Sequence, residues 1–224
     1  MKEVIAMIKL CIFDLDGTVA DTLKSIAYFA NNALKKYGFE PFSEDDYRYF
    51  VGDGADLLIR RITEKSGGND DDYKKIKAEY MKTYNADCTH LLKTYDGITE
   101  LLQNLKKLKI NRVILSNKPQ IQAESVAKSL FKDGLIDDCF GGREGIPLKP
   151  NPKITNEIIE KYGFQKSECL FIGDTKTDIM TAKNCGIKSV GVLWGFRDKA
   201  ELTAHGADFI AHTPNDILSF IKTL

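Results

Sequence analysis

The feature that most constrains this chain is a short apolar run that ends in two carboxylates. Residues 10–13 read Leu-Cys-Ile-Phe, and Asp14 and Asp16 follow with one residue between them. Continuous hydrophobicity over a few residues is typical of a strand in a parallel sheet, because both faces of such a strand are covered. The sequence therefore predicts a buried strand, with Asp14 and Asp16 at the carboxyl end where open α/β sheets bind their ligands.

Asp14 and Asp16 are expected to face one site, because residues i and i+2 of an extended chain point to the same side. Gly17 and Thr18 then form a tight turn. Two ionised carboxylates held this close repel each other unless a cation or a proton lies between them. A bound Mg²⁺ would remove the repulsion. A strand followed by an Asp-rich turn, without any metal, explains these residues alone equally well.

Length and composition exclude several classes of protein. A chain of 224 residues suits one large domain or a core with an insertion. Lys and Arg together number 32, as do Asp and Glu, so the charge gives no reason to expect a nucleic-acid or membrane partner. No apolar run approaches the ~20 residues of a transmembrane helix, and residues 1–6 lack the apolar core of a signal peptide. The start at Met1 or at Met7 stays open.

The five cysteines form no Cys-x-x-Cys pair, and two of them lie in apolar, strand-like runs. This usage is typical of reduced structural thiols and predicts a cytoplasmic protein.

Hydrophobic periodicity changes along the chain. Residues 21 to about 88 carry only helical patterns, over 23–37, 44–50, 57–64 and 70–86. From residue 95 onward, helical patterns alternate with short apolar runs at 111–115, 139–140, 169–172, 189–193 and 208–211. Such alternation predicts an α/β fold with a doubly wound, Rossmann-like parallel sheet. The helical block is then an insertion after the first strand, joined to the core by two linkers.

Polar groups suited to phosphate follow two of these segments. Ser116 and Asn117 come directly after the strand at 111–115, and a helix begins soon after them. A hydroxyl and free backbone N–H groups would therefore point toward a bound anion. Lys149 lies in a loop that Pro147 and Pro150 stiffen, and a positioned ammonium acts as a point charge for phosphate.

Two further carboxylates, Asp174 and Asp178, flank the turn after the strand at 169–172. Each polar group taken alone has an ordinary explanation as a helix cap, a solvated lysine or a first-turn acid. Their coincidence at four strand ends favours one shared site instead. Hard carboxylate oxygens are the ligands that Mg²⁺ prefers, usually together with water and substrate phosphate.

Taken together, these motifs resemble those of the haloacid-dehalogenase superfamily of phosphatases. The four motifs are matched, in order, by Asp14-Leu-Asp16-Gly17-Thr18, Ser116-Asn117, Lys149-Pro150, and Gly173-Asp174 with Asp178. The helical block is similar to the type-one cap of that superfamily. This resemblance implies an all-helical cap domain of residues 21–91 inserted into a core domain of residues 1–20 and 92–224. Within the cap, residues 51–58 together with Arg61 resemble the phosphoglycolate phosphatase subgroup.

The resemblance also implies a mechanism, namely Mg²⁺-dependent hydrolysis of a phosphomonoester in two steps. Asp14 would be the nucleophile that forms an aspartyl phosphate, and Asp16 would be the general acid and base. Ser116, the Asn117 N–H and Lys149 would hold the phosphoryl oxygens. The implied metal site comprises Asp14, the backbone carbonyl of Asp16, Asp174 and Asp178. Asp178 would act directly, through water, or by orienting Lys149.

The implied substrate is a small phosphorylated metabolite, with 2-phosphoglycolate the first choice. The residues expected to bind it are Gly17, Thr18, Asn117, Gly52, Gly54 and Arg61. Arg61 could instead form a solvated pair with Arg60. A sugar phosphomutase, a pyrophosphatase and a non-catalytic binding protein on the same scaffold stay open as alternatives, as do the monomeric and homodimeric states.

Overall fold

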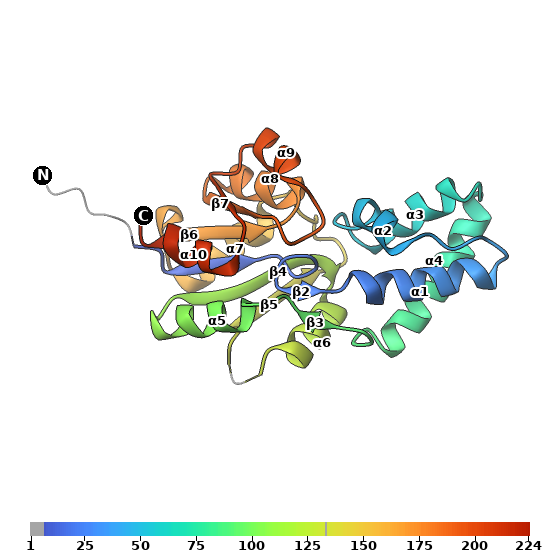
Figure 1. The fold of residues 1–224 in the computed structure, drawn as a ribbon, viewed down its shortest axis with the longest axis horizontal. Helices are drawn as coiled ribbons and strands as arrows, with labels where there is room; N and C mark the ends of the chain where they lie inside the picture. The colour runs from blue at the N-terminus through green and yellow to red at the C-terminus, as the bar shows by residue number, and fades with distance from the viewer. Residues whose placement is uncertain (1–6, 133) are drawn as a thin grey trace, which may run out of the picture.

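The computed structural model describes residues 7–132 and 134–224 and contains a six-stranded parallel sheet with helices on both faces (Figure 1). Residues 1–6, and with them the alternative start Met1, lie outside the described residues. The strands are β1 (Leu10–Phe13), β4 (Asn111–Pro119), β5 (Asp138–Gly142), β6 (Cys169–Gly173), β7 (Lys188–Val192) and β8 (Phe209–Ala211). Their spatial order is β5-β4-β1-β6-β7-β8. The predicted fold class, a doubly wound α/β sheet, is confirmed.

The strand order places the start of the chain in the middle of the sheet. From β1 the sheet grows through β4 and β5 on one side and through β6, β7 and β8 on the other. Phe13, at the end of β1, pairs in register with Ile114 of β4 and Ile172 of β6. The residues that follow these three strands therefore meet at one edge of the sheet, at the point where the strand order reverses.

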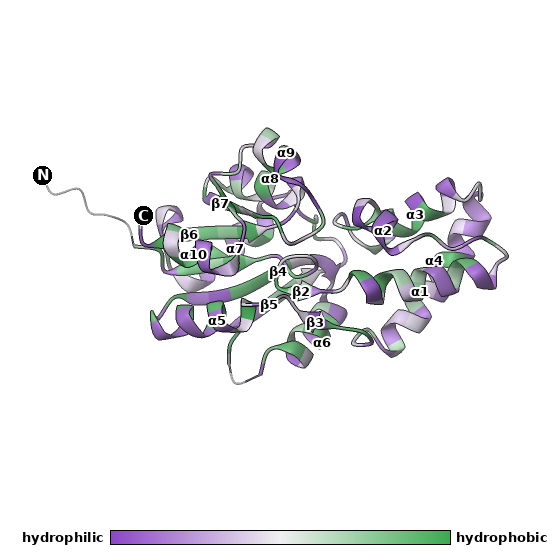
Figure 2. Cartoon of the chain, viewed as in Figure 1, coloured by the Kyte–Doolittle hydropathy of each residue, from purple (hydrophilic) through white to green (hydrophobic). Residues whose placement is uncertain are grey.

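Both faces of the sheet are covered, which explains the apolar runs. Leu10 and Ile12 pack in one cluster with α7 (Lys153–Tyr162) and α8 (Lys176–Cys185). Cys11 and Phe13 point to the opposite face, in a cluster with α5 (Ile98–Lys107), α6 (Gln120–Leu130) and α10 (Pro214–Ile221). The helices turn hydrophilic residues outward (Figure 2). A 3₁₀ turn (Lys166–Glu168) precedes β6, and α9 (Lys199–Ala204) follows β7.

Four helices form a group at the end of the molecule away from the C-terminus (Figure 1). They are α1 (Leu23–Lys36), α2 (Glu44–Phe50), α3 (Ala55–Lys65) and α4 (Asp70–Ala86). Ser43 and Asn69 begin α2 and α4 with reciprocal capping boxes. The two segments that join this group to the sheet pair as the short antiparallel strands β2 (Ala20–Asp21) and β3 (Lys93–Thr94). The predicted helical insertion is thus present, and its division into a separate domain at residues 21–91 stays a prediction.

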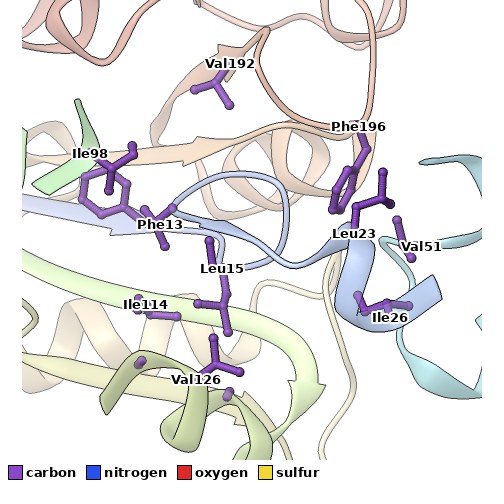
Figure 3. Close-up of a cluster of buried hydrophobic side chains, with 14 of the residues drawn as sticks. Phe13, Leu15, Leu23, Ile26, Val51, Ile98, Ile114, Val126, Val192 and Phe196 are labelled. Carbon is purple, nitrogen blue, oxygen red and sulfur yellow. The ribbon is translucent and has the colours of Figure 1, made fainter. Parts of the chain in front are cut away.

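One apolar cluster runs from the sheet into this helical group (Figure 3). Phe13 and Leu15 belong to its sheet side, while Leu23, Ile26 and Val51 continue it on the side of the inserted helices. All five side chains are buried. Apolar contacts therefore hold the two parts together beside the carboxyl ends of the strands.

Two of the boundaries that differ from the sequence-based expectation lie at the predicted site. β4 runs through Pro119 instead of ending at residue 115, so Ser116 and Asn117 lie within the strand rather than after it. The pairing of β4 with β5 shifts register between Leu115 and Pro119, which lets the strand continue past these polar residues. Helix α8 begins three residues before the expected residue 179, because Asp178 forms a capping box with Thr175.

Across the described part of the chain, no helix combines the length and the apolar character needed to cross a bilayer.

Candidate active site

A buried cluster of three carboxylates and one lysine lies at the carboxyl ends of β1 and β6. Lys149 Nζ lies 2.8 Å from Asp14 Oδ1 and 2.7 Å from Asp178 Oδ1, and its side chain is 3% exposed. One carboxylate oxygen from each of Asp14, Asp174 and Asp178 lies within 4.8 Å of the other two. The pairing of β1 with β6 brings Asp14 and Asp174 together, so the sheet itself builds this cluster from distant parts of the sequence.

Negatively charged groups are crowded together in this buried cluster, and this shifts their pKa values. Burial, with the Asp178 and Asp174 carboxylates, raises the pKa of Asp14 well above its usual range, although Lys149 opposes this shift. Burial and the Asp178 carboxylate raise the pKa of Asp174 to about 7. Burial would lower the pKa of Lys149, but Asp14 and Asp178 raise it, so Lys149 stays charged. The cluster thus has three carboxylates and one ammonium, which pairs with Asp14 and Asp178.

Hydrogen bonds hold the carboxylates in place from behind. Thr18 Oγ1 donates to Asp174 Oδ1 at 3.0 Å, and the Phe196 N–H donates to Asp174 Oδ2 at 2.8 Å. The backbone N–H and the hydroxyl of Thr175 both donate to Asp178 Oδ2. Gly17 has a φ of +89°, and a Cβ there would lie 2.3 Å from Asp174 Oδ2. The turn after β1 therefore requires glycine because it packs directly against Asp174.

The donor set of this cluster fits a divalent metal ion. Asp14, Asp174 and Asp178 supply hard carboxylate oxygens, which suit Mg²⁺, Ca²⁺ or Mn²⁺ rather than softer metals. Burial and the neighbouring carboxylates raise the pKa of Asp14 and of Asp174, because the ionised forms are poorly solvated and repel one another. A divalent cation would offset that repulsion.

Asp16 is held apart from the cluster by a lysine that the sequence analysis missed. Lys118 Nζ lies 2.9 and 3.0 Å from the two carboxylate oxygens of Asp16. Lys118 is itself buried, and its ammonium lies 5.1 Å from the ring centroid of Tyr84 in α4. Its position directly after Ser116 and Asn117 was the available signal, since the carboxyl ends of strands in open α/β sheets are where ligands bind.

The polar pair in β4 serves partly to position other groups. Asn117 Oδ1 accepts from the Lys149 N–H at 2.8 Å, and Asn117 Nδ2 donates to the Lys149 carbonyl at 3.1 Å. These two bonds fasten the Lys149 loop to the sheet. Ser116 Oγ accepts from the Lys118 N–H at 3.1 Å, and Ser116 also lines the adjoining cavity. Contact of Ser116 and Asn117 with phosphate stays a prediction.

A small cavity separates this edge of the sheet from the inserted helices. The space open to the centres of water molecules is about 40 Å³, so the cavity is small. Its sheet side is formed mainly by Asp14, Asp16, Ser116, Asn117, Lys118 and Gln122. The nucleophile and the acid–base residue implied by the family pattern therefore open into the same space.

The opposite wall comes from the start of α3 and from α4. Gly52, Gly54, Leu58 and Tyr80 contribute to it. Gly54 has a φ of +92°, and a Cβ there would meet Leu148 at 3.4 Å and the Asn117 carbonyl at 3.5 Å. Glycine therefore lets the backbone of this wall approach the sheet closely.

Three residues expected to bind substrate lie outside the described lining of the cavity: Gly17, Thr18 and Arg61. The first two support Asp174, as described above. Arg61 donates to the Phe50 carbonyl at 2.9 Å and pairs with Asp53 at 2.5 Å. Burial would raise the pKa of Asp53, but hydrogen bonds from Arg61 and Thr177 lower it. Arg61 is thus committed to the loop before α3, and its contact with substrate stays a prediction.

Hydrogen bonds cross from the inserted helices to the sheet on both sides of this loop. Asp53 Oδ1 accepts from Thr177 Oγ1 at 3.0 Å. Arg48 donates to the Gly195 carbonyl at 2.7 Å, and Arg197 donates to the carbonyls of Arg48 and Val51, the latter at 3.0 Å. Because Phe196 binds Asp174, the segment that holds the inserted helices also contacts the carboxylate cluster.

A family model described as haloacid dehalogenase-like hydrolase matches residues 11–192. The chain belongs to this family. It is 32% identical over 222 residues to a phosphoglycolate phosphatase from Vibrio parahaemolyticus, with 96% of each chain covered. It is 28% identical to a phosphoglycolate phosphatase from Mannheimia succiniciproducens, with 95% of this chain and 98% of that protein covered.

Solved structures agree with this assignment. A protein from Lactobacillus delbrueckii subsp. bulgaricus, predicted to be a phosphoglycolate phosphatase, superposes with a TM-score of 0.91 at 27% identity, covering 96% of this chain and 98% of that one. A predicted phosphoglycolate phosphatase from Haemophilus somnus gives a TM-score of 0.87 at 27% identity, with coverage of 95% and 97%. The family, the relatives and the site together make this haloacid dehalogenase-like hydrolase a phosphatase.

Proposed function

We propose that this phosphatase hydrolyses a small phosphomonoester, 2-phosphoglycolate, through an aspartyl phosphate on Asp14 and with Mg²⁺ as cofactor. The observation that carries the proposal is the buried group of Asp14, Lys149, Asp174 and Asp178 at the ends of β1 and β6. It combines a carboxylate nucleophile with a fixed cation and a set of hard oxygen ligands. A binding module has no need of this combination.

In the first step an oxygen of Asp14 attacks phosphorus, and the bond between phosphorus and the ester oxygen breaks. Asp16, which opens into the same cavity as Asp14, gives its proton to the departing oxygen and releases glycolate. Lys149 lies 2.8 Å from Asp14 and faces the negative charge that the transferring phosphoryl group brings.

In the second step water attacks the phosphorus of the aspartyl phosphate. Asp16, now a carboxylate, takes a proton from this water, the bond from phosphorus to the Asp14 oxygen breaks, and phosphate leaves. Asp14 and Asp16 return to their starting states, so one molecule of water is consumed for each ester cleaved. The pair of Asp16 with Lys118 keeps the carboxylate oriented toward the cavity between the two steps.

Asp14, Asp174 and Asp178 would hold the Mg²⁺ ion, together with the backbone carbonyl of Asp16. When bound, the ion offsets the repulsion between the Asp14 carboxylate and the phosphate. Asp178 has a second role within the chain, because its Oδ1 atom orients Lys149 at 2.7 Å. Its other oxygen is occupied by Thr175, which favours an indirect contact with the metal through water.

We also propose that residues 21–91 act as a cap domain that opens and closes over a core of residues 1–20 and 92–224. The paired linkers β2 and β3 supply the hinge, and the hydrogen bonds from Arg48 and Arg197 hold the closed form. Closure would exclude bulk water during the first step, and opening would admit the hydrolytic water.

Two observations support 2-phosphoglycolate as the substrate. The cavity is small, with about 40 Å³ open to the centres of water molecules, which suits a two-carbon leaving group better than a sugar. The relatives from Vibrio parahaemolyticus and Mannheimia succiniciproducens carry the name phosphoglycolate phosphatase. We place the protein in the cytoplasm as well, because its five cysteines are free and four of them are buried.

A product assay tests the proposal. The purified protein is given 2-phosphoglycolate, a hexose 1-phosphate or pyrophosphate, each with Mg²⁺ and with excess chelator. We expect metal-dependent release of phosphate that is fastest from 2-phosphoglycolate. A hexose phosphate isomer as product would identify a mutase, preferred cleavage of pyrophosphate would identify a pyrophosphatase, and no turnover of any compound would support a binding protein.

A further inference from the structure

The cavity has one cationic side chain among its described lining residues, and this is Lys118. Its side chain is 6% exposed. Lys149 is not among these lining residues, and its ammonium pairs with Asp14 and Asp178. A ligand group that lies between the sheet and the inserted helices therefore meets a single ammonium, and that ammonium belongs to β4.

The arginines of the inserted helices are already committed to other groups. Arg61 binds the Phe50 carbonyl and Asp53. Arg60 pairs with Asp70, and its guanidinium lies 3.8 Å from the ring centroid of Tyr73. Neither arginine belongs to the described lining of the cavity. The charge that selects an anionic substrate must then come from elsewhere.

The chemistry of the proposed substrate fixes where this charge has to lie. In 2-phosphoglycolate the carboxylate is bonded to the carbon that carries the ester oxygen. The group that protonates that oxygen and the group that binds the carboxylate must therefore be neighbours. Lys118 Nζ lies 2.9 Å from Asp16 Oδ1, so it satisfies this requirement.

The surroundings of Lys118 suit an ammonium that pairs with Asp16 and with a carboxylate of the substrate. Asp16 is its one ion-pair partner among the described residues, and an ammonium has three N–H donors. On the side of α4, the ring of Tyr84 lies 5.1 Å from the ammonium and stacks on the ring of Tyr80, 5.2 Å away. A buried ammonium beside aromatic rings gains strongly from a second carboxylate, because little water is present to replace it.

We propose that Lys118 determines specificity by binding a carboxylate on the leaving group of the substrate, beside Asp16. This inference rests on the proposed function, since it assigns the recognition of glycolate to a particular residue. It moves the expected carboxylate contact from Arg61 in the inserted helices to Lys118 in the sheet. Arg61 then shapes the loop before α3 through Asp53.

The test measures binding, so that it does not depend on turnover. Two non-hydrolysable phosphonates, 3-phosphonopropionate and propylphosphonate, differ only in the carboxylate. Their dissociation constants are measured by calorimetry in Mg²⁺ for the parent, Lys118→Met, Lys118→Arg and Arg61→Met. Lys128→Met, an exposed lysine of α6, is the matched control for the loss of one positive charge.

We expect the parent to bind 3-phosphonopropionate more tightly, and Lys118→Met to reduce that preference by about 10- to 100-fold, the scale of a hydrogen bond to a charged group. Lys118→Arg, which keeps the charge, should retain part of the preference. Arg61→Met should weaken both ligands alike, and Lys128→Met should weaken neither.

Three outcomes would overturn the inference. They are equal binding of the two phosphonates by the parent, an equal loss for both in Lys118→Met, or loss of the preference in Arg61→Met. Failure of the proposed function is separate from these. If the preference for 3-phosphonopropionate depends on Lys118 while 2-phosphoglycolate releases no phosphate, Lys118 still binds a carboxylate. The substrate is then another carboxylated phosphate ester.

Discussion

The two walls of the cavity are built by different means. On the sheet side, charged side chains are buried and paired with one another, as in Asp14 with Lys149 and Asp16 with Lys118. On the side of the inserted helices, the wall consists of backbone at Gly52 and Gly54 and of apolar or aromatic side chains. The arginines nearest this wall are bound to other groups outside the cavity, many of them backbone carbonyls.

The sheet side therefore supplies the reacting groups, and the side of the inserted helices sets the size and shape of the space for substrate. Buried charge pairs are costly to disturb and hold reacting groups in fixed positions. A wall of backbone and apolar groups sets the size of the space and can move as one body. Changes on the sheet side should therefore alter the reaction itself, while changes at the junction should alter how often the closed form exists.

Removal of the proposed nucleophile should have the largest effect on the reaction. Asp14→Asn should lower kcat by at least about 10⁴-fold, because an amide oxygen is a poor nucleophile and loses the pairing with Lys149. Steady-state phosphate release measures the effect, and circular dichroism checks that the fold is retained. Activity within tenfold of the parent would exclude Asp14 as the nucleophile.

Asp16→Asn should have the next largest effect, a loss of roughly 10²- to 10⁴-fold in kcat, the usual contribution of general acid–base catalysis. The loss should shrink as the leaving group becomes more acidic, since an acidic alcohol needs no proton to depart. A series of aryl and alkyl phosphates measures this dependence. Equal losses across the whole series would contradict the acid role of Asp16.

Asp174→Asn should raise the Mg²⁺ concentration that gives half-maximal activity by about 100-fold, since a metal-ligating carboxylate is lost. Thr18 and Phe196 hold this side chain, so the asparagine should occupy the same position. The measurement is a metal titration of activity. The control is Asp208→Asn, which should leave the titration unchanged. Asp208 directly precedes the edge strand β8 and accepts a hydrogen bond from the Ser189 N–H.

The sheet side of the site could be predicted from the sequence because its motifs are local. A strand that ends in Asp14 and Asp16 places both at the sheet edge whatever the rest of the chain does. The same holds for Asp174 after β6. The family pattern and the order of these strand ends were enough to predict that Asp14 and Asp174, 160 positions apart, lie close together. The structure places both in one cluster with Asp178.

The contacts of the inserted helices could not be predicted in this way. Arg61 and Asp53 are close in sequence, but the partner that fixes Asp53 is Thr177, 124 residues away. Such contacts depend on how α1–α4 pack on the sheet, and hydrophobic periodicity gives no information on this. On the sheet side, the pairing of Lys118 with Asp16 joins the ends of two neighbouring strands across 102 residues. The early end predicted for β4 has a similar cause, since the register shift with β5 is a tertiary feature.

Metal binding should stabilise the sheet side without any substrate. At a Mg²⁺ concentration 100 times its dissociation constant at pH 8, the free energy of unfolding at pH 8 should rise by about 2.7 kcal/mol, measured as a shift of the thermal midpoint. At the same Mg²⁺ concentration the gain should be smaller at pH 6, because metal binding is weaker there. The pKa of Asp174 is raised to about 7, so its contribution to metal-free stability is lost as the pH rises through 7, where the ionised carboxylate becomes free to bind metal.

A gain that is equal at both pH values, or absent, would contradict a metal site made of these crowded carboxylates. Asp174→Asn provides the control, because it lacks the group that titrates and should show a smaller shift at pH 8.

The smallest effect should come from the junction, where Arg197 joins the segment after β7 to the loop before α3. Arg197 donates to the carbonyls of Arg48 and Val51, so Arg197→Met removes two bonds that hold the closed form. We expect kcat/KM to fall by about tenfold, the equivalent of one or two net hydrogen bonds. The factor should be the same for 2-phosphoglycolate and for an aryl phosphate, because Arg197 acts on closure and touches no substrate group in this arrangement. Lys199→Met, two residues away and exposed, should have no effect. A loss confined to one substrate would place Arg197 among the residues that recognise the leaving group. The division between a sheet side that carries out the reaction and a helical side that controls closure would then be wrong.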